Sequence, residues 1–252
     1  MSYVLVLGRR ALVEAVRTPE ALVPTLFIPL FFLVVNVGQA ARIFPGKSTA
    51  FLHGQGYGAF QLPSSMLLAA SFGSAALFLV EEIEDGYFDK LRATPVPRSA
   101  IILGRLAAEG VKALLIASVI VLLGLAFGIR IASGVPGFVL LVLLTAGWAV
   151  VYSGFMQIIA LKTRSAAATN SAGLVFFPLL FLTPNFVPFN RLSPLMETLA
   201  RINPVSYVIV GMRGLIIDGW NLGQIAVAVV VIVALGAILT GLSLRVIANY
   251  DR

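Results

Sequence analysis

Charged residues divide this chain into six long uncharged segments, at residues 21–41, 48–80, 113–129, 131–161, 165–190 and 219–244. Each segment can hold one membrane-crossing helix, which needs about 17 to 25 predominantly apolar residues. The predicted fold class is therefore an all-α polytopic membrane protein with one domain over residues 1–252. We expect six transmembrane helices, near residues 21–39, 57–80, 107–129, 137–161, 166–186 and 223–245.

Composition and charge agree with this prediction. The chain is 59% hydrophobic and 12% charged, and its mean hydropathy is +0.99. The net charge of +7 does not indicate nucleic-acid binding, because the basic residues flank apolar segments and no soluble domain remains to carry a basic face. With both termini in the cytoplasm, 12 of the 18 Lys and Arg residues lie inside, as the positive-inside rule requires. The absence of cysteine excludes disulfides and thiolate chemistry.

Residues 2–18 are too charged to cross a membrane, and their pattern predicts a helix that lies on the inner leaflet. The apolar positions share one helical face, namely Leu5, Leu12 and Val16. The polar positions share the opposite face, namely Arg10, Glu14 and Arg17.

Residues 81–98 place eight charged side chains between two apolar segments. Three larger side chains recur every four residues, namely Ile83, Tyr87 and Leu91, and three acids share another face, namely Glu82, Asp85 and Asp89. This pattern predicts a short amphipathic surface helix, which Gly86 weakens and which Pro95 and Pro97 end. A solvated loop whose acids balance nearby Lys and Arg residues is the simpler alternative. The density of acids and aromatic residues favours a docking surface.

Residues 187–222 are rich in Pro and Asn but too apolar for a free loop. We expect short helices that dip into the outer leaflet without crossing it. The apolar run at residues 205–217 contains Arg213, which is either a snorkelling charge or a gate or headgroup contact.

Two motifs carry a resemblance to a known family. The pattern E-x-G-x-x-x-x-L-x-x-x-P, formed by Glu84, Gly86, Leu91 and Pro95, resembles the first cytoplasmic loop of ABC-2 type permeases. Residues 179–215 resemble the outer region of the daunorubicin-resistance type of these permeases, with Phe-Val-Pro at 186–188, Asn-Pro at 203–204 and Arg-Gly at 213–214. With the N-terminal helix and the six apolar segments, the resemblance covers essentially the whole chain.

The resemblance implies the membrane subunit of a prokaryotic exporter in the plasma membrane, in which a coupling helix is seated in a cleft of a separate ATP-binding cassette subunit. The implied coupling residues are Glu82, Glu84, Asp85, Gly86, Tyr87, Phe88, Asp89, Leu91 and Pro95. It also implies two ATPase subunits, which bind ATP and Mg, and a second permease chain that is either identical or a paralogue. The chain has no G-x-x-x-x-G-K-[ST] motif, since Gly46-Lys47-Ser48 has Ala41 where the first Gly belongs.

The resemblance further implies that the second and fifth spans face a substrate path. The candidate lining residues are Gln61, Ser64, Ser71, Asn170, Phe177 and Phe181, and the candidate outer gate residues are Phe186, Pro188 and Arg213. Packing between helices is the alternative role for the lining residues. The expected cargo is a hydrophobic or amphipathic drug or antibiotic, with a lipid or lipid-linked glycan as the alternative.

Two other classes are disfavoured. An intramembrane protease would join Glu81-Glu82 to several histidines, but the single His53 is expected on the opposite side of the membrane. No G-x-S-x-G motif is present, so no catalytic residue is expected. An ion-driven transporter would need an ionisable group at mid-membrane, and the nearest, Glu109, has Arg105 and Lys112 as helical neighbours.

Overall fold

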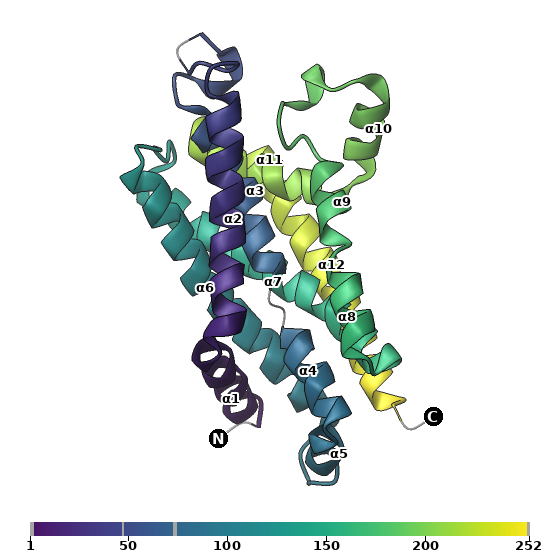
Figure 1. Ribbon diagram of the computed structural model, residues 1–252. Coiled ribbons are helices and arrows are strands. Elements are labelled where there is room, and N and C mark those ends of the chain that lie inside the picture. Colours follow the sequence, from purple (N-terminus) through teal and green to yellow (C-terminus); the bar gives the residue numbers. More distant parts are fainter. Residues whose placement is uncertain (1–2, 47, 73–74, 251–252) are drawn as a thin grey trace.

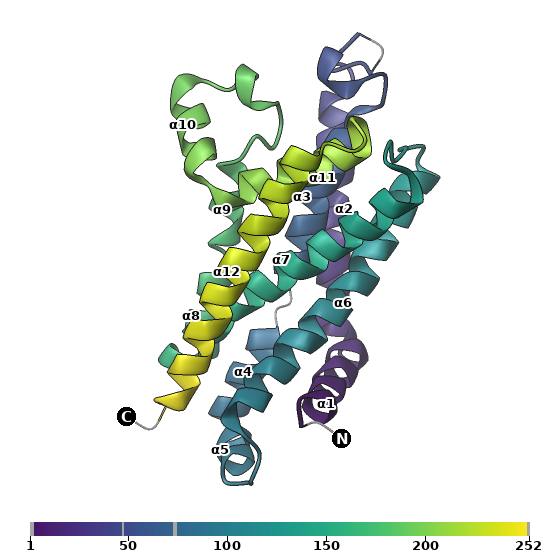
Figure 2. The same ribbon diagram turned by 180° about the vertical axis from the view of Figure 1, so that it is seen from behind.

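The computed structural model describes residues 3–46, 48–72 and 75–250, and these residues form helices and turns with no strand among them (Figure 1). The long helices α2 (Pro19–Ala40), α6 (Arg98–Ala126), α7 (Gly134–Thr163) and α12 (Leu222–Ala248) run obliquely along an elongated bundle (Figures 1 and 2). Both chain ends lie at the end of the bundle that carries α5 (Tyr87–Arg92). We call this the α5 end, and the other the α10 end after α10 (Pro194–Ile202).

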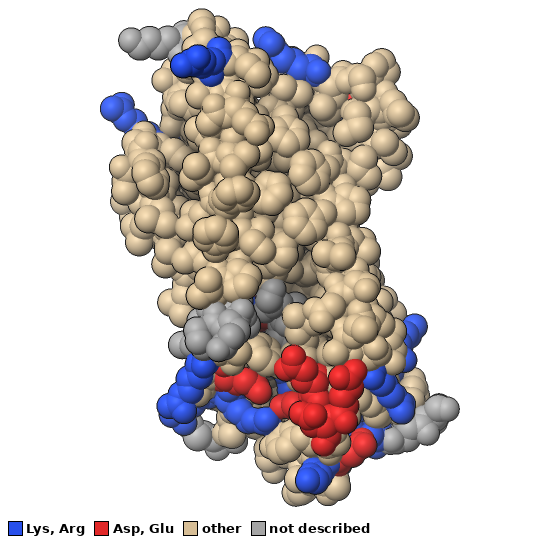
Figure 3. Space-filling model, viewed as in Figure 1, with Lys and Arg blue, Asp and Glu red and all other residues tan. Residues whose placement is uncertain are grey.

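On the surface that Figure 3 shows, charged side chains gather at the two ends of the bundle and leave an uncharged belt between them. Within the described residues, five stretches are long and apolar enough to cross a membrane, namely Val23–Ala40, Tyr57–Glu84, Arg98–Ala126, Gly134–Thr163 and Leu222–Ala248. The belt is what a polytopic membrane protein requires, because charges are costly in hydrocarbon.

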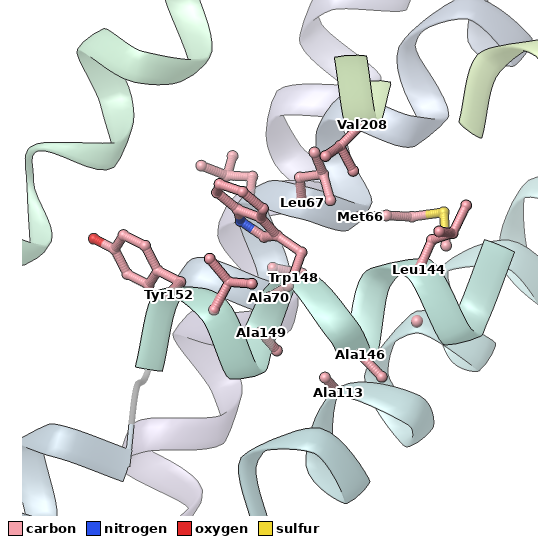
Figure 4. Packing of buried hydrophobic residues seen from close by; sticks show 14 of the residues in the cluster. Met66, Leu67, Ala70, Ala113, Leu144, Ala146, Trp148, Ala149, Tyr152 and Val208 are labelled. Carbon is pink, nitrogen blue, oxygen red and sulfur yellow. The ribbon is translucent and has the colours of Figure 1, made fainter. Parts of the chain in front are cut away.

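Helix α7 forms the centre of the bundle, where it contacts α3 (Tyr57–Ser71), α6 and α12. Trp148 of α7 is buried, and its indole nitrogen donates a 3.0 Å hydrogen bond to the Ser71 hydroxyl. Figure 4 shows the side chains around it, which come from α3, α6, α7 and α11 (Pro204–Ile217). The indole group thus joins a polar contact to an apolar core, as a buried tryptophan usually does.

The second predicted span is not one continuous helix. Helix α3 ends at Ser71, Phe72 adopts an extended conformation, and α4 begins at Ala75 and ends at Glu84. Residues 73–74 lie outside the described residues. The second predicted span, near residues 57–80, thus contains a break in its helix at Phe72, and α3 and α4 lie on either side of that break.

The fifth predicted span, residues 166–186, also consists of two short pieces. Helix α8 (Ala166–Gly173) is followed by α9 (Phe176–Phe181). A loop then leads to the 3-10 helix η2 (Phe189–Arg191), α10 and α11, which confirms that residues 187–222 form short helices. Asn203 starts α11, since its side-chain oxygen accepts a 3.0 Å hydrogen bond from the Val205 amide.

The N-terminal helix α1 (Tyr3–Arg17) confirms the helix predicted over residues 2–18, of which residue 2 lies outside the described part. Small residues of α1 pack against the protein, whereas a leucine of the face predicted to lie on the leaflet is exposed. Leu5 is 64% exposed, whereas Ala11 and Ala15 are buried. The side chain of Val16 is not among those described.

Two glycines bring α1 against α6. A methyl group on Gly104 would come within 3.0 Å of the Gly8 amide nitrogen and 3.2 Å of the Val4 carbonyl oxygen. Small residues permit such close approach between helices in membranes.

We predict that Gly104→Leu separates α1 from α6 and destabilises the protein by about 1–3 kcal/mol, because the added atoms meet backbone. Gly241→Leu in α12 is the control, since a Cβ atom added there meets nothing within 4 Å. Thermal unfolding of both purified variants in detergent tests this, and equal midpoints would contradict the close contact.

Candidate functional site: the α5 end of the bundle

The charged segment at residues 81–98 folds into the end of α4, a turn, helix α5 and the start of α6. Gly86 forms the turn with φ = +72°, a conformation that residues with a side chain rarely adopt. This turn divides the single amphipathic helix predicted through Gly86 into two, so Ile83 and Tyr87 do not share a continuous helical face. Pro95 lies in the link that ends α5 and precedes α6.

Glu82 joins three helices. Its carboxylate lies 2.6 Å from the Arg10 guanidinium of α1, and it forms a second ion pair with Arg105 of α6. Glu82 is 8% exposed and Arg105 is 5% exposed. Charges so deeply buried are tolerated when they are paired and hydrogen-bonded, so this junction holds α1, α4 and α6 together. The prediction that Glu82 belongs to an outward acidic face is wrong.

A second buried ion pair lies further along α6. The Lys112 ammonium is 2.6 Å from a Glu109 carboxylate oxygen, and both residues are almost fully buried. This confirms the pairing expected from their spacing of three residues. It gives Glu109 a structural partner in place of a role in proton relay.

Helix α5 is also tied to the end of the chain. Phe88 is buried and its ring packs edge-on against Tyr250 at 5.2 Å between centroids. Tyr250 lies between two guanidinium groups, with Arg92 at 4.5 Å and Arg164 at 4.0 Å from its ring centroid. Arg164 also donates a 2.7 Å hydrogen bond to the Tyr250 carbonyl. These cation–π contacts link α5, the α7–α8 turn and the end of α12.

Glu84 connects α4 to α8. Its carboxylate accepts a 2.7 Å hydrogen bond from the backbone amide of Ala166, at the N-terminus of α8. Ser165 caps the same helix through the Ala168 amide. A carboxylate at this position also interacts favourably with the helix dipole.

Four exposed acids form a surface that we call the acidic patch. Figure 3 shows it as one group of carboxylates at the α5 end. Its members are Glu81, Glu84, Asp85 and Asp89, all exposed. Tyr87 is 42% exposed beside it, and the Arg10 guanidinium lies 4.5 Å above its ring.

Of the other predicted coupling and interfacial residues, Leu91 is half-buried, Glu14 is half-buried and Arg17 is exposed. Thr18 ends α1 by donating its hydroxyl to the Glu14 carbonyl at 2.8 Å. Sequence reasoning missed the roles of Arg164 and Tyr250, because residues so distant along the chain give no local signal of their contact.

Three of the predicted path residues are enclosed within the chain. Gln61 donates hydrogen bonds to the Tyr57 hydroxyl at 2.8 Å and to the Asn185 carbonyl at 2.9 Å. Ser71 donates to the Leu67 carbonyl, and Ser64 is also buried. Gln61 and Ser71 therefore make polar contacts between packed segments, and the buried Ser64 hydroxyl has no hydrogen-bond partner among the described residues. That these three residues line a substrate path stays a prediction.

The other three path residues lie closer to the surface. Asn170 and Phe181 are exposed, and Phe177 packs its ring 5.4 Å from Phe72. The predicted gate residue Phe186 is exposed and packs 5.9 Å from Phe181. The other two gate residues, Pro188 and Arg213, line a cavity of about 450 Å³ at the α10 end, away from α5.

The described residues contain no group of three or more His, Cys, Asp or Glu side chains arranged to hold a metal ion. His53 lies 2.9 Å from Asp218, which follows α11. It therefore contacts an acid of the α10 end and not Glu81, the partner that a protease-like site would require.

The sequence of this chain matches a known protein family. The ABC-2 type transporter family matches residues 3–217. The chain is 24% identical over 244 residues to the daunorubicin resistance ABC transporter permease protein DrrB1 of Streptomyces coeruleorubidus, covering 95% of this chain and 84% of that protein. It is also 24% identical over 213 residues to a probable doxorubicin resistance ABC transporter permease protein, DrrC, of Mycobacterium tuberculosis, covering 83% of this chain and 75% of that protein.

We predict that Glu82→Gln lowers the free energy of unfolding by about 3 kcal/mol, because it leaves the buried Arg105 guanidinium without its counter-charge. Glu81→Gln is the matched control, since the neighbouring acid is exposed and should change stability by less than about 0.5 kcal/mol. Denaturant or thermal unfolding in detergent measures both. Similar losses in the two variants would show that Glu82 does not hold the junction.

Proposed function

Because this chain belongs to the ABC-2 type transporter family, we propose that it is the membrane-spanning permease subunit of an ATP-driven exporter of a hydrophobic or amphipathic drug or antibiotic. The family match and the similarity to permeases named for daunorubicin and doxorubicin resistance support this assignment. Within these 252 residues no phosphate-binding loop occurs, so separate subunits bind ATP and Mg.

The working transporter contains two permease chains, identical or paralogous, and two ATPase subunits. Exposed apolar side chains on α2 and α12 support the proposal that a single chain is incomplete. They include Phe27, Val34, Val230 and Val233, each more than 60% exposed in the single chain. Such surfaces suit lipid or a second membrane protein and not water.

Six segments cross the prokaryotic plasma membrane, with α3–α4 and α8–α9 as the two interrupted spans. Both termini and α5 lie in the cytoplasm, and α1 lies along the inner leaflet. The uncharged belt and the position of both termini at the α5 end support this topology (Figures 1 and 3). Irregular backbone inside a span is tolerated where surrounding protein shields it.

The observation that carries the proposal is that α5 has one side packed against the protein and one side exposed. Its inner side is fixed by Phe88 against Tyr250, while Asp85 and Asp89 face outward with Tyr87. Helix α5 is the coupling helix in this proposal. Movement of the ATPase pushes on it, and Glu82 and Glu84 pass the displacement to α1, α6 and α8.

Co-expression with a candidate cassette ATPase tests the function directly. Everted membrane vesicles should accumulate daunorubicin when ATP is added, and an ATPase variant without its P-loop lysine should abolish accumulation. If no cassette ATPase co-purifies with the chain and vesicles show no ATP-dependent uptake, the proposal fails.

We predict that Asp85→Lys weakens binding of the ATPase about fivefold, because reversing an exposed charge at an interface alters affinity by roughly 1 kcal/mol. Glu197→Lys is the control, since it makes the same change on α10 at the opposite end of the bundle. Affinity is measured by titrating purified ATPase onto nanodisc-embedded permease. Equal affinities of both variants would rule out the acidic patch as the docking surface.

We also predict that Gly86→Val uncouples ATP hydrolysis from transport while leaving membrane insertion intact. The left-handed turn costs a branched residue about 1–2 kcal/mol, which displaces α5 from its contacts. Gly86→Asn should retain coupling, since Asn tolerates this conformation. Substrate-stimulated ATPase activity in proteoliposomes distinguishes them, and identical activities would contradict a role for the turn.

A further inference from the structure

The cavity at the α10 end has a wall that is mainly apolar and aromatic. Phe60 of α3, Pro184 and Phe189 line it, together with Arg213 and Asp218. Its volume of about 450 Å³ is comparable to that of a small-molecule site. The residues that line this cavity make none of the contacts described at the α5 end.

Arg213 is buried at this cavity and only partly satisfied. The residue is 7% exposed, and its guanidinium lies 3.4 Å from the ring centroid of Phe60. Nε donates to the Phe60 carbonyl and Nη1 donates to the Pro184 carbonyl, both at 3.0 Å. Nη2 is buried and has no hydrogen-bond partner among the described residues.

No carboxylate of the described residues lies within ion-pairing distance of Arg213, in contrast to the buried Arg105, which pairs with Glu82. The acid that lines the same cavity, Asp218, is 2.9 Å from His53. The Arg213 guanidinium thus contacts carbonyl groups and a ring, and Asp218, which lines the same cavity, attracts it without forming a direct ion pair. A cation buried in this way in a membrane protein is costly unless it is used.

A second polar side chain of the cavity wall has an unpaired acceptor, which lies beside Gly214. Gln224 of α12 lines the wall, and its side-chain oxygen is buried without a hydrogen-bond partner among the described residues. A ligand that satisfies both groups therefore carries an anionic oxygen for Arg213 and a hydroxyl or amine donor for Gln224. The planar guanidinium suits phosphate oxygens in particular.

We propose that this cavity binds the phosphate-bearing headgroup of an amphiphile, with Arg213 holding the phosphate and the aromatic wall accepting the apolar part. A membrane phospholipid with hydroxyl groups on its headgroup has all three features. The cavity lies beside the ends of the apolar helices α3, α11 and α12, and lipid headgroups occupy that level of a bilayer.

Lipid binding to the purified full-length chain tests this proposal. Native mass spectrometry in detergent follows titration with phosphatidylglycerol, with diacylglycerol as the probe that lacks phosphate and glycerol phosphate as the probe that lacks acyl chains. We expect phosphatidylglycerol to bind and diacylglycerol to bind at least tenfold more weakly, given the strength of charged hydrogen bonds. Binding of glycerol phosphate as tight as that of the lipid would identify the source as a free phosphate ester; weaker binding would identify it as the lipid.

Arg213→Gln should lower phosphatidylglycerol affinity at least tenfold, while Arg130→Gln, an exposed arginine outside the cavity, should not change it. Because Arg213 also bonds two carbonyl groups, its substitution can disturb folding, so two isosteric changes of the cavity wall are needed. Asn190→Asp adds a charge and should weaken binding about two- to fivefold, and Asp218→Asn removes one and should strengthen it by a similar factor.

Opposite shifts of the two isosteric variants with phosphatidylglycerol, and no shift with diacylglycerol, would establish the site. Unchanged affinities, or shifts in the same direction, would overturn it and leave Arg213 as a contact between α11 and the 184–188 loop. Loss of the permease dimer in Arg213→Gln with unaltered lipid binding would also overturn it, because the guanidinium would then face a second copy of the chain.

Discussion

A charge is costly in the apolar middle of a membrane-spanning bundle, and the arrangement of the whole chain depends on that constraint. On the surface that Figure 3 shows, charged side chains of the described residues gather at the two ends and leave an uncharged belt. Two groups of buried charges form ion pairs: Glu82 at the α5 end lies between Arg10 and Arg105, and Glu109 lies beside Lys112 in the middle of α6. Arg213 at the α10 end has carbonyl groups and a ring in place of a carboxylate. Glu82 is therefore neutralised by ion pairs at the α5 end, whereas Arg213 at the α10 end forms no direct ion pair with the described residues.

The uncharged segments were sufficient to predict α2, α6, α7 and α12, and the Pro- and Asn-rich composition was sufficient to predict short helices after α9. The interruption after Ser71 could not be predicted, because an apolar run carries no periodic signal that distinguishes one long helix from two short ones. The placement of Glu82 was missed for another reason. A helical wheel assumes an unbroken helix, whereas the positive φ of Gly86 ends α4 and reorients α5, so residues before and after it no longer share a face.

Side-chain size differs between the packed and the exposed positions of α1. In α1 the small residues Ala11 and Ala15 are buried, and the large Leu5 is exposed. Lipid is as apolar as leucine, so large side chains gain little by leaving it, while small residues allow backbones to approach and pack. The polar residues of α3 follow the same logic. Gln61 and Ser71 hydrogen-bond within the bundle, and an unsatisfied amide or hydroxyl in hydrocarbon would cost more than any benefit from facing a path.

In the proposed coupling role, the acids at the α5 end make two kinds of contact. Glu82 is buried in ion pairs with α1 and α6, whereas Glu84 is exposed and accepts a hydrogen bond from the N-terminus of α8. Asp85 and Asp89 remain exposed, and Tyr87 beside them is backed by the Arg10 guanidinium. A partner that fits this surface therefore needs cationic side chains opposite the acids and an apolar contact opposite the tyrosine. Phe88 and Arg92 of α5 contact Tyr250 on its inner side, so in the proposed mechanism a push on the exposed side would move the ends of several helices together.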